Sequence, residues 1–192
     1  MTSTQATLVL LGGVPGAGKT VTLRALAATS PRIRVADSDL VRRRLARRIG
    51  WAPYPLCRPF VHVLAHLAVL LQVLRRGDGP LVVHDPGTRS WSRRLLLWLG
   101  LRLGYAPAAV FIDVDRDAAL QGQSARGRMV REHAFDRHWR RWARLRAQIA
   151  EGSEPTPGER WPRLLLTNRD RALADVLAVL AGRSVPHTPS VG

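Results

Sequence analysis

Residues 7–24 read TLVLLGGVPGAGKTVTLR, and the rest of the chain is organised around them. The run from Thr7 to Leu11 is apolar and typical of a buried β-strand. The next segment, Gly13 to Thr20, matches the pattern G-x-x-x-x-G-K-[ST] at every fixed position, and a helical pattern of apolar residues follows. Strand, glycine loop and helix in this order are the context in which this pattern binds phosphate groups, so we expect a phosphate loop here.

The loop pattern also predicts what its residues do. Glycines allow consecutive backbone amides to turn toward phosphate oxygens, and the N-terminus of the following helix adds a positive end. Lys19 is expected to reach the β- and γ-phosphates of a nucleotide, and the Thr20 hydroxyl is expected to ligate Mg²⁺. The expected nucleotide-binding residues of this segment are Gly13, Pro15, Gly16, Ala17, Gly18, Lys19, Thr20 and Val21. The alternative is a glycine turn that matches the pattern by chance.

Lys19 is the only lysine among the 30 lysine and arginine residues of the chain. The planar guanidinium group of arginine does not replace a compact ammonium group among phosphates. A chain this biased toward arginine that keeps a lysine in the loop indicates that the position does not accept arginine.

Length and composition predict one globular domain over residues 1–182 and a flexible tail over 183–192, because 192 residues with 46% hydrophobic content suffice for a full core. The single Cys57 excludes an intrachain disulfide and favours a reducing, cytoplasmic location. No basic-then-apolar leader precedes the phosphate loop, so no signal peptide is expected. The longest apolar run, 60–74, is too short and too polar to span a bilayer, so we expect no membrane partner.

The net charge of +16 attracts polyanions. Aromatic content is only 6%, and the sequence has no RNA-binding or helix-turn-helix signature. We therefore attribute the charge to arginine bias and to a phosphate-handling cleft. The alternative that stays open is a non-catalytic or regulatory nucleotide-binding module that contacts nucleic acid through its basic surface.

Strand and helix patterns alternate along the chain, which predicts an α/β fold with a parallel sheet and helices on both faces. The expected strands are 7–11, 32–36, 81–85, 108–113 and 164–166. The expected helices are 19–29, 40–49, 60–76, 90–103, 116–125, 134–150 and 171–181, and the three prolines of residues 50–59 indicate a loop. Ligands of such sheets bind at the carboxyl ends of the strands.

Two aspartates, Asp37 and Asp39, follow the second expected strand. A carboxylate at this place can orient and deprotonate an acceptor hydroxyl, or hold a water bound to Mg²⁺. The alternative is that Ser38 or Asp39 caps a helix that begins at Leu40.

Two further aspartates, Asp85 and Asp113, each end an apolar strand. A carboxylate there can accept a hydrogen bond from Thr20 or from a water on Mg²⁺. We favour Asp85 for the metal and a structural role for Asp113, although either can instead cap the turn that follows it. The neighbouring His84 is expected to be an interior histidine with a hydrogen-bond partner.

Arginines of residues 126–133 are predicted to form a mobile lid. Arg126, Arg128 and Arg131 would stabilise charge on the γ-phosphate and exclude water, and the alternative is a solvated basic loop. Arg89, just after the third strand, is expected to reach the acceptor, as is Arg131.

Five segments in order carry a resemblance to a known family: GGVPGAGKT, ADSDLVRR, VVHDPGTR, FIDVDRDAAL and SARGRMVREH. Over about residues 6–182 the chain resembles the small P-loop kinases of the nucleoside-monophosphate-kinase-like group. It looks most similar to their chloramphenicol phosphotransferase, zeta-toxin, and gluconate and shikimate kinase branches. Within residues 50–60 and 86–105 it carries no zeta-toxin or shikimate-site pattern, so the acceptor stays open.

The resemblance implies a P-loop NTPase three-layer sandwich whose five parallel strands have the order 2-3-1-4-5. It implies an ATP- and Mg²⁺-dependent transfer of phosphoryl to a hydroxyl of a small molecule, such as an antibiotic, a sugar or a nucleotide sugar. Asp39 would be the base, Asp37 would lie near Mg²⁺, and Arg126 and Arg128 would be lid arginines. Asn168 and Arg169 would flank the adenine.

Overall fold

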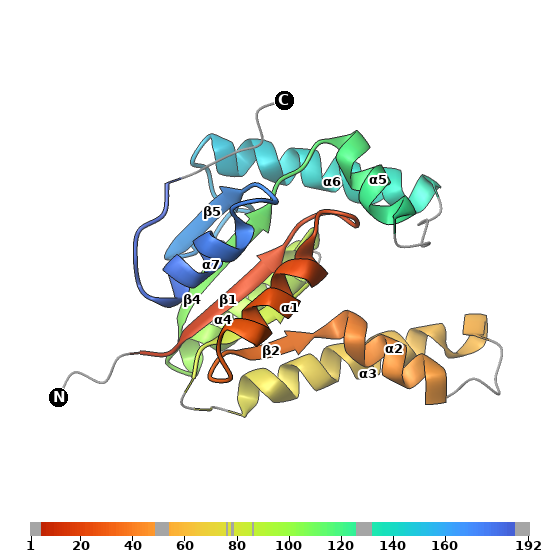
Figure 1. Ribbon diagram of the computed structural model, residues 1–192, viewed down its shortest axis with the longest axis horizontal. Helices are drawn as coiled ribbons and strands as arrows, with labels where there is room; N and C mark the ends of the chain where they lie inside the picture. The colour runs from red at the N-terminus through yellow and green to blue at the C-terminus, as the bar shows by residue number, and fades with distance from the viewer. Residues whose placement is uncertain are drawn as a thin grey trace.

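The computed structural model describes residues 5–48, 54–75, 77, 79–85, 87–125 and 132–186. The strands of this part are β1 (Thr7–Gly12), β2 (Arg34–Asp37), β3 (Leu81–His84), β4 (Ala106–Ile112) and β5 (Arg163–Thr167). They form one parallel sheet in the order β2-β3-β1-β4-β5, which confirms the predicted order (Figure 1).

Helices cover both faces of this sheet, as predicted (Figure 1). Their bounds are α1 (Lys19–Thr29), α2 (Ser38–Arg48), α3 (Tyr54–Leu74), α4 (Ser90–Arg102), α5 (Arg116–Ser124), α6 (Glu132–Ala150) and α7 (Ala172–Leu180). One face is covered by α1 and α7, which contact each other, and the opposite face by α4 and α6. Helices α2 and α3 pack together beside the β2 edge (Figure 1).

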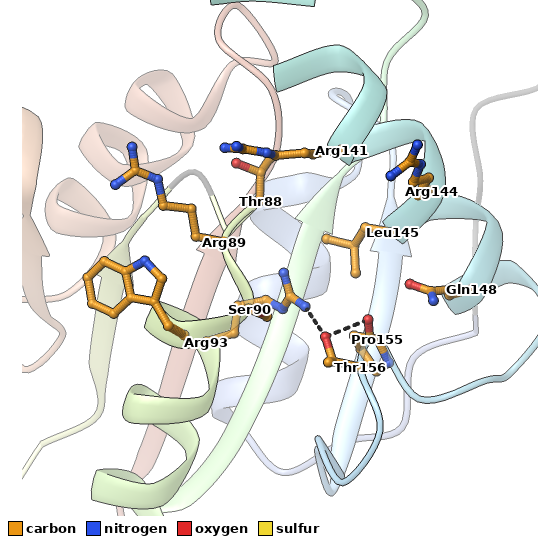
Figure 2. Close-up of a pocket in the computed structure, with 11 residues that line it drawn as sticks. Thr88, Arg89, Ser90, Arg93, Arg141, Arg144, Leu145, Gln148, Pro155 and Thr156 are labelled. Carbon is orange, nitrogen blue, oxygen red and sulfur yellow. Dashed lines mark hydrogen bonds between the residues drawn. The ribbon is translucent and has the colours of Figure 1, made fainter. Parts of the chain in front are cut away.

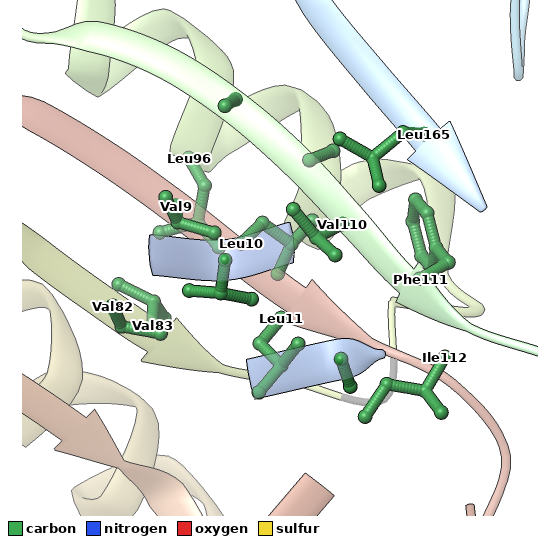
Figure 3. Close-up of a cluster of buried hydrophobic side chains, with 14 of the residues drawn as sticks. Val9, Leu10, Leu11, Val82, Val83, Leu96, Val110, Phe111, Ile112 and Leu165 are labelled. Carbon is green, nitrogen blue, oxygen red and sulfur yellow. The ribbon is translucent and has the colours of Figure 1, made fainter. Parts of the chain in front are cut away.

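The core surrounds β1, whose six residues are all buried. This strand is flanked on both sides, because Leu10 pairs with Val83 of β3 and with Ala109 of β4. A parallel strand that is covered on both faces needs apolar side chains at every position, and this explains the unbroken run found in the sequence. Figure 3 shows side chains of the central strands packed with Leu96 of α4.

Two helix starts differ from the prediction. The helix α3 begins at Tyr54 rather than at residue 60, so the loop predicted over 50–59 is wrong for residues 54–59. Pro55 lies in the first turn of α3, where the missing N–H has no intrahelical partner in any case, so this proline does not oppose the helix. The helix α2 begins at Ser38, and a cap at Ser38 or Asp39 is therefore wrong because both residues are already helical.

Much of the apolar surface of α3 faces outward. The helix buries Val61, Ala65, Val69 and Val73 against the rest of the protein. Its exposed large apolar side chains are Phe60, Val63, Leu64, Leu67, Leu71 and Leu74. None of the helices in the described ranges is long and apolar enough to cross a membrane.

Candidate functional site

The phosphate loop connects β1 to α1 at the carboxyl end of the sheet. Three of its residues, Gly13, Gly16 and Gly18, have φ values of 135°, 93° and 102°. Residues that carry a side chain rarely adopt such positive φ values, so the loop needs glycine at these positions. A Cβ atom on Gly16 would also lie 2.0 Å from the carbonyl oxygen of Ala119, because α5 packs directly against the loop.

Lys19 is the first residue of α1, and its side chain folds back over the loop. Its Nζ donates hydrogen bonds to the carbonyl oxygens of Gly13, at 2.7 Å, and Val14, at 2.8 Å. The residue is only 6% exposed, so its charge lies at the centre of the loop rather than in solvent. The N-terminal end of α1 begins at the same place, and the first amides of a helix can donate to an anion there.

Asp37 and His84 form a buried pair on neighbouring strands near this lysine. The Asp37 Oδ1 lies 2.7 Å from the His84 Nδ1, and the side chain of Asp37 is 12% exposed. Burial lowers the pKa of His84, the hydrogen bond to Asp37 opposes this, and the charge of Lys19 lowers the pKa further. Neutral His84 therefore donates its Nδ1–H to the carboxylate, which agrees with the expected interior histidine.

The two other strand-end aspartates have different partners. Oδ1 of Asp85 accepts hydrogen bonds from the Gly87 amide, at 2.7 Å, and from the Ser92 hydroxyl, at 3.3 Å. The Asp85 carboxylate therefore caps the turn after β3, which was the alternative to a metal-binding role. It also lies at the carboxyl end of the sheet, as Asp37 does. Asp113 is buried and accepts a hydrogen bond from Nε of Arg146 at 2.8 Å, which is a structural contact.

The loop after β5 lies against the phosphate loop. Nη2 of Arg169 donates to the carbonyl oxygens of Gly16, at 3.1 Å, and Ala118, at 3.2 Å. The neighbouring Asn168 accepts a hydrogen bond from the amide of Arg171 at 3.0 Å through its side-chain oxygen. The resemblance implied that these two residues flank the adenine, and the structure places Arg169 in contact with the phosphate loop.

Several predicted site residues lie outside the described part. Arg126, Arg128 and Arg131 belong to residues 126–131, which the description does not include. Asp39 is the second residue of α2, but its side chain is likewise outside the description. Thr20 is half-buried and Val21 is exposed on α1. In the described ranges, no three histidine, cysteine, aspartate or glutamate side chains converge as a metal site.

A cavity of about 510 Å³ opens beside the turn after β3 (Figure 2). Its walls come from this turn, the start of α4, one side of α6 and the loop before β5. They comprise Thr88, Arg89, Ser90, Trp91, Arg93, Arg141, Arg144, Leu145, Gln148, Pro155 and Thr156. Arg89, which was predicted to reach the acceptor, therefore lines this cavity.

His138 on α6 contacts the turn after β3 beside the cavity. Its Nδ1 lies 3.4 Å from the hydroxyl oxygen of Thr88. Burial lowers the pKa of His138, and four surrounding positive charges lower it further: Arg141, Arg89, Lys19 and Arg137. Sequence reasoning found neither His138 nor the arginines of α6, because an arginine-rich helix is usually a solvated one and no motif marks them.

A buried ion pair holds the floor of the cavity. Nε and Nη2 of Arg93 on α4 donate to the two carboxylate oxygens of Glu159, at 2.7 and 2.8 Å. Trp161 donates to the same carboxylate at 2.8 Å, and Arg93 also donates to the carbonyl oxygen of Gly87 and the hydroxyl of Thr156. Both charged groups are at least 97% buried, so the turn after β3 and the loop before β5 are fixed to each other.

The glycine loop at the end of β1 and the sheet order define a P-loop protein with the fold of small-molecule kinases. A family model described as an AAA domain matches residues 8–151, and the chain belongs to this family. No curated protein shows a significant match by sequence.

Solved structures with this fold come from several bacteria. The tunicamycin resistance protein of Deinococcus radiodurans has a TM-score of 0.56 at 19% identity, over 96% of this chain and 100% of that one. The shikimate kinase of Acinetobacter baumannii, in complex with shikimate, has a TM-score of 0.53 at 19% identity, over 95% of this chain and 97% of that one. A gluconokinase of Sinorhizobium meliloti has a TM-score of 0.53 at 16% identity, over 92% of each chain. At these identities the likeness shows a shared fold.

The Arg93–Glu159 pair leads to a prediction about stability. Glu159→Gln keeps the size of the side chain but leaves the Arg93 charge buried without its counter-charge. We expect the free energy of unfolding to fall by about 3–5 kcal/mol, measured by denaturant titration. Glu154→Gln is the matched control, because its pair with Arg160 lies at the surface, and it should change stability little. Equal losses in the two variants would contradict the assigned role of the buried pair.

Proposed function

We propose that the protein is an ATP-dependent phosphotransferase that moves the γ-phosphoryl group of ATP to a hydroxyl of a small molecule. The oxygen of the hydroxyl would form a bond to the γ-phosphorus, the bond between this phosphorus and the bridging oxygen would break, and ADP would leave. Membership of the AAA domain family and the shared fold with a shikimate kinase and a gluconokinase support this class of reaction.

The observation that carries the proposal is the position of Lys19. Its ammonium group is buried and held by two carbonyl oxygens of a loop whose glycines adopt left-handed conformations. An anion that binds beside the loop would stabilise this buried positive charge. A loop of this shape at a helix N-terminus suits the phosphates of a nucleotide.

The residues around the loop fit Mg²⁺, which prefers oxygen ligands and commonly keeps several waters. Thr20 supplies a hydroxyl at the start of α1, and Asp37 and Asp85 supply carboxylates at the ends of β2 and β3. We propose Thr20 as a direct ligand and the two aspartates as partners of bound waters. The ion would neutralise charge on the phosphates during transfer.

Asp39 and the arginines of the predicted lid, residues 126–133, would act on the acceptor and on the transferred group. Asp39 would orient the hydroxyl and take its proton as the new bond forms. Arg126 and Arg128 would stabilise charge on the γ-phosphoryl, and Arg131 would contact the acceptor. Asn168 and Arg169 would flank the adenine, a role supported by the contact of Arg169 with the phosphate loop.

Substitution of Lys19 tests the proposed reaction. Wild type should release ADP when screened with a panel of sugars, nucleotide sugars and hydroxyl-bearing antibiotics. Lys19→Ala should lower this turnover by about 10²-fold or more, as should Lys19→Arg, because the larger guanidinium does not fit the place of the ammonium group. Arg24→Lys, an exposed change on α1, is the matched control and should be silent. Near-normal turnover by Lys19→Arg would contradict the proposal.

A second pair of variants distinguishes the proposed roles of Asp37 and Asp39. Asp39→Asn should lower kcat by about 10²–10⁴-fold through loss of the base, with ATP affinity unchanged. Asp37→Asn keeps an oxygen that can accept from His84 but loses the charge, so it should weaken Mg²⁺-dependent ATP binding, measured calorimetrically. If only Asp39→Asn weakens ATP binding, the two roles are assigned the wrong way round.

A further inference from the structure

Four arginines line the cavity, and one of them, Arg93, pairs with the carboxylate of Glu159. Outside the cavity, Arg116, Arg146, Arg160 and Arg171 also form ion pairs with carboxylates. By contrast, the guanidinium groups of Arg89, Arg141 and Arg144 make no hydrogen bond or ion pair within the described ranges. No carboxylate lines the cavity that these three share.

The three arginines approach the cavity from two different elements. Arg89 belongs to the turn after β3, whereas Arg141 and Arg144 lie one turn apart on α6. Figure 2 shows Arg141 reaching toward Thr88 from α6, with Arg89 on the other side of this threonine. Like charges in one concave space repel each other, and an anion that binds between them would remove this repulsion.

The start of α4 adds further donors to the same wall. Arg89 is the N-cap residue of this 13-residue helix and provides no side-chain cap. The next residues, Ser90 and Trp91, line the cavity. The first amides of a helix lack intrahelical partners and favour anions, so backbone and side chains select the same charge.

The cavity is placed and shaped to hold part of an acceptor. Its volume of about 510 Å³ is in the range of small-molecule sites. Thr88 contacts His138 and follows Gly87, where a Cβ atom would lie 3.5 Å from the Cα of Gly12, so this wall of the cavity lies near the start of the phosphate loop. Leu145 and Pro155 add apolar surface, and the buried Arg93–Glu159 pair fixes the walls before any ligand binds.

We propose that the phosphoryl acceptor carries an anionic oxygen group, a carboxylate or a phosphate, and that Arg89, Arg141 and Arg144 bind this group in the cavity. The proposal rests on the proposed function, since it concerns the acceptor of that reaction. Arginine is suited to this task because its planar fork donates two parallel hydrogen bonds to such groups. The anionic group would fix the acceptor in the cavity while its hydroxyl extends toward the phosphate loop.

The test measures anion binding with the phosphate loop occupied. The protein is saturated with Mg²⁺ and a non-hydrolysable ATP analogue and is then titrated calorimetrically with four probes: inorganic phosphate, glucuronate, glucose 6-phosphate and neutral glucose. We expect at least one anionic probe to bind and glucose not to bind. Glucuronate and the phosphate probes distinguish the two kinds of anionic group.

Two double variants locate the binding site. Arg141→Ala/Arg144→Ala removes two charges from the cavity, and Arg24→Ala/Arg183→Ala removes two exposed charges from the opposite face of the sheet. The first should weaken anion binding at least about tenfold, because it removes two donors of charged hydrogen bonds to the anion, while the second should leave it within twofold. Unchanged analogue affinity and circular dichroism verify that both variants fold.

The outcomes separate this inference from the proposed function. Absence of binding by every anionic probe, equal binding of glucose, or equal losses in the two double variants would overturn the anionic acceptor. Failure of wild type to bind the ATP analogue would instead overturn the proposed function, and anion binding that depends on Arg141 and Arg144 would still support an anion site in the cavity.

Discussion

The hydrogen bonds from the Lys19 ammonium to the carbonyls of Gly13 and Val14 set the geometry on which the rest of the site depends. They can form only if the loop turns tightly, which the left-handed glycines allow. The loop is then enclosed by α5, which approaches Gly16 closely, and by Arg169 from the loop after β5. The phosphate loop follows the buried strand β1 directly, so the hydrophobic core determines the position of the site.

Local sequence patterns predicted most of the fold because their information is itself local. Unbroken apolar runs such as 7–11 mark strands that are covered on both faces, and the glycine loop fixes the first crossover. The sheet order came from the resemblance carried by five motifs. The start of α3 was missed because proline was treated as a breaker at a position, Pro55, where the first turn of a helix accepts it.

The candidate site was predictable where it follows a motif and not where it depends on distant contacts. Lys19 and Arg169 were expected near a nucleotide, and each of them contacts the phosphate loop. Glu159 lies 66 residues from Arg93, and nothing in the local sequence around either predicts that they pair. The arginines of α6 form a cavity wall only because the sheet brings this helix to the start of α4, and a net charge of +16 does not reveal which charges remain unpaired.

The central claim is that the conformation of the phosphate loop is preformed for binding a nucleoside triphosphate. A crystal structure with Mg²⁺ and a non-hydrolysable ATP analogue tests this most directly. We expect the β- and γ-phosphates within the loop of residues 13–20, the Lys19 ammonium in contact with their oxygens, and a loop backbone that matches the present one within about 1 Å. An analogue bound elsewhere, or a loop rebuilt around it with Lys19 turned away from the phosphates, would contradict the account.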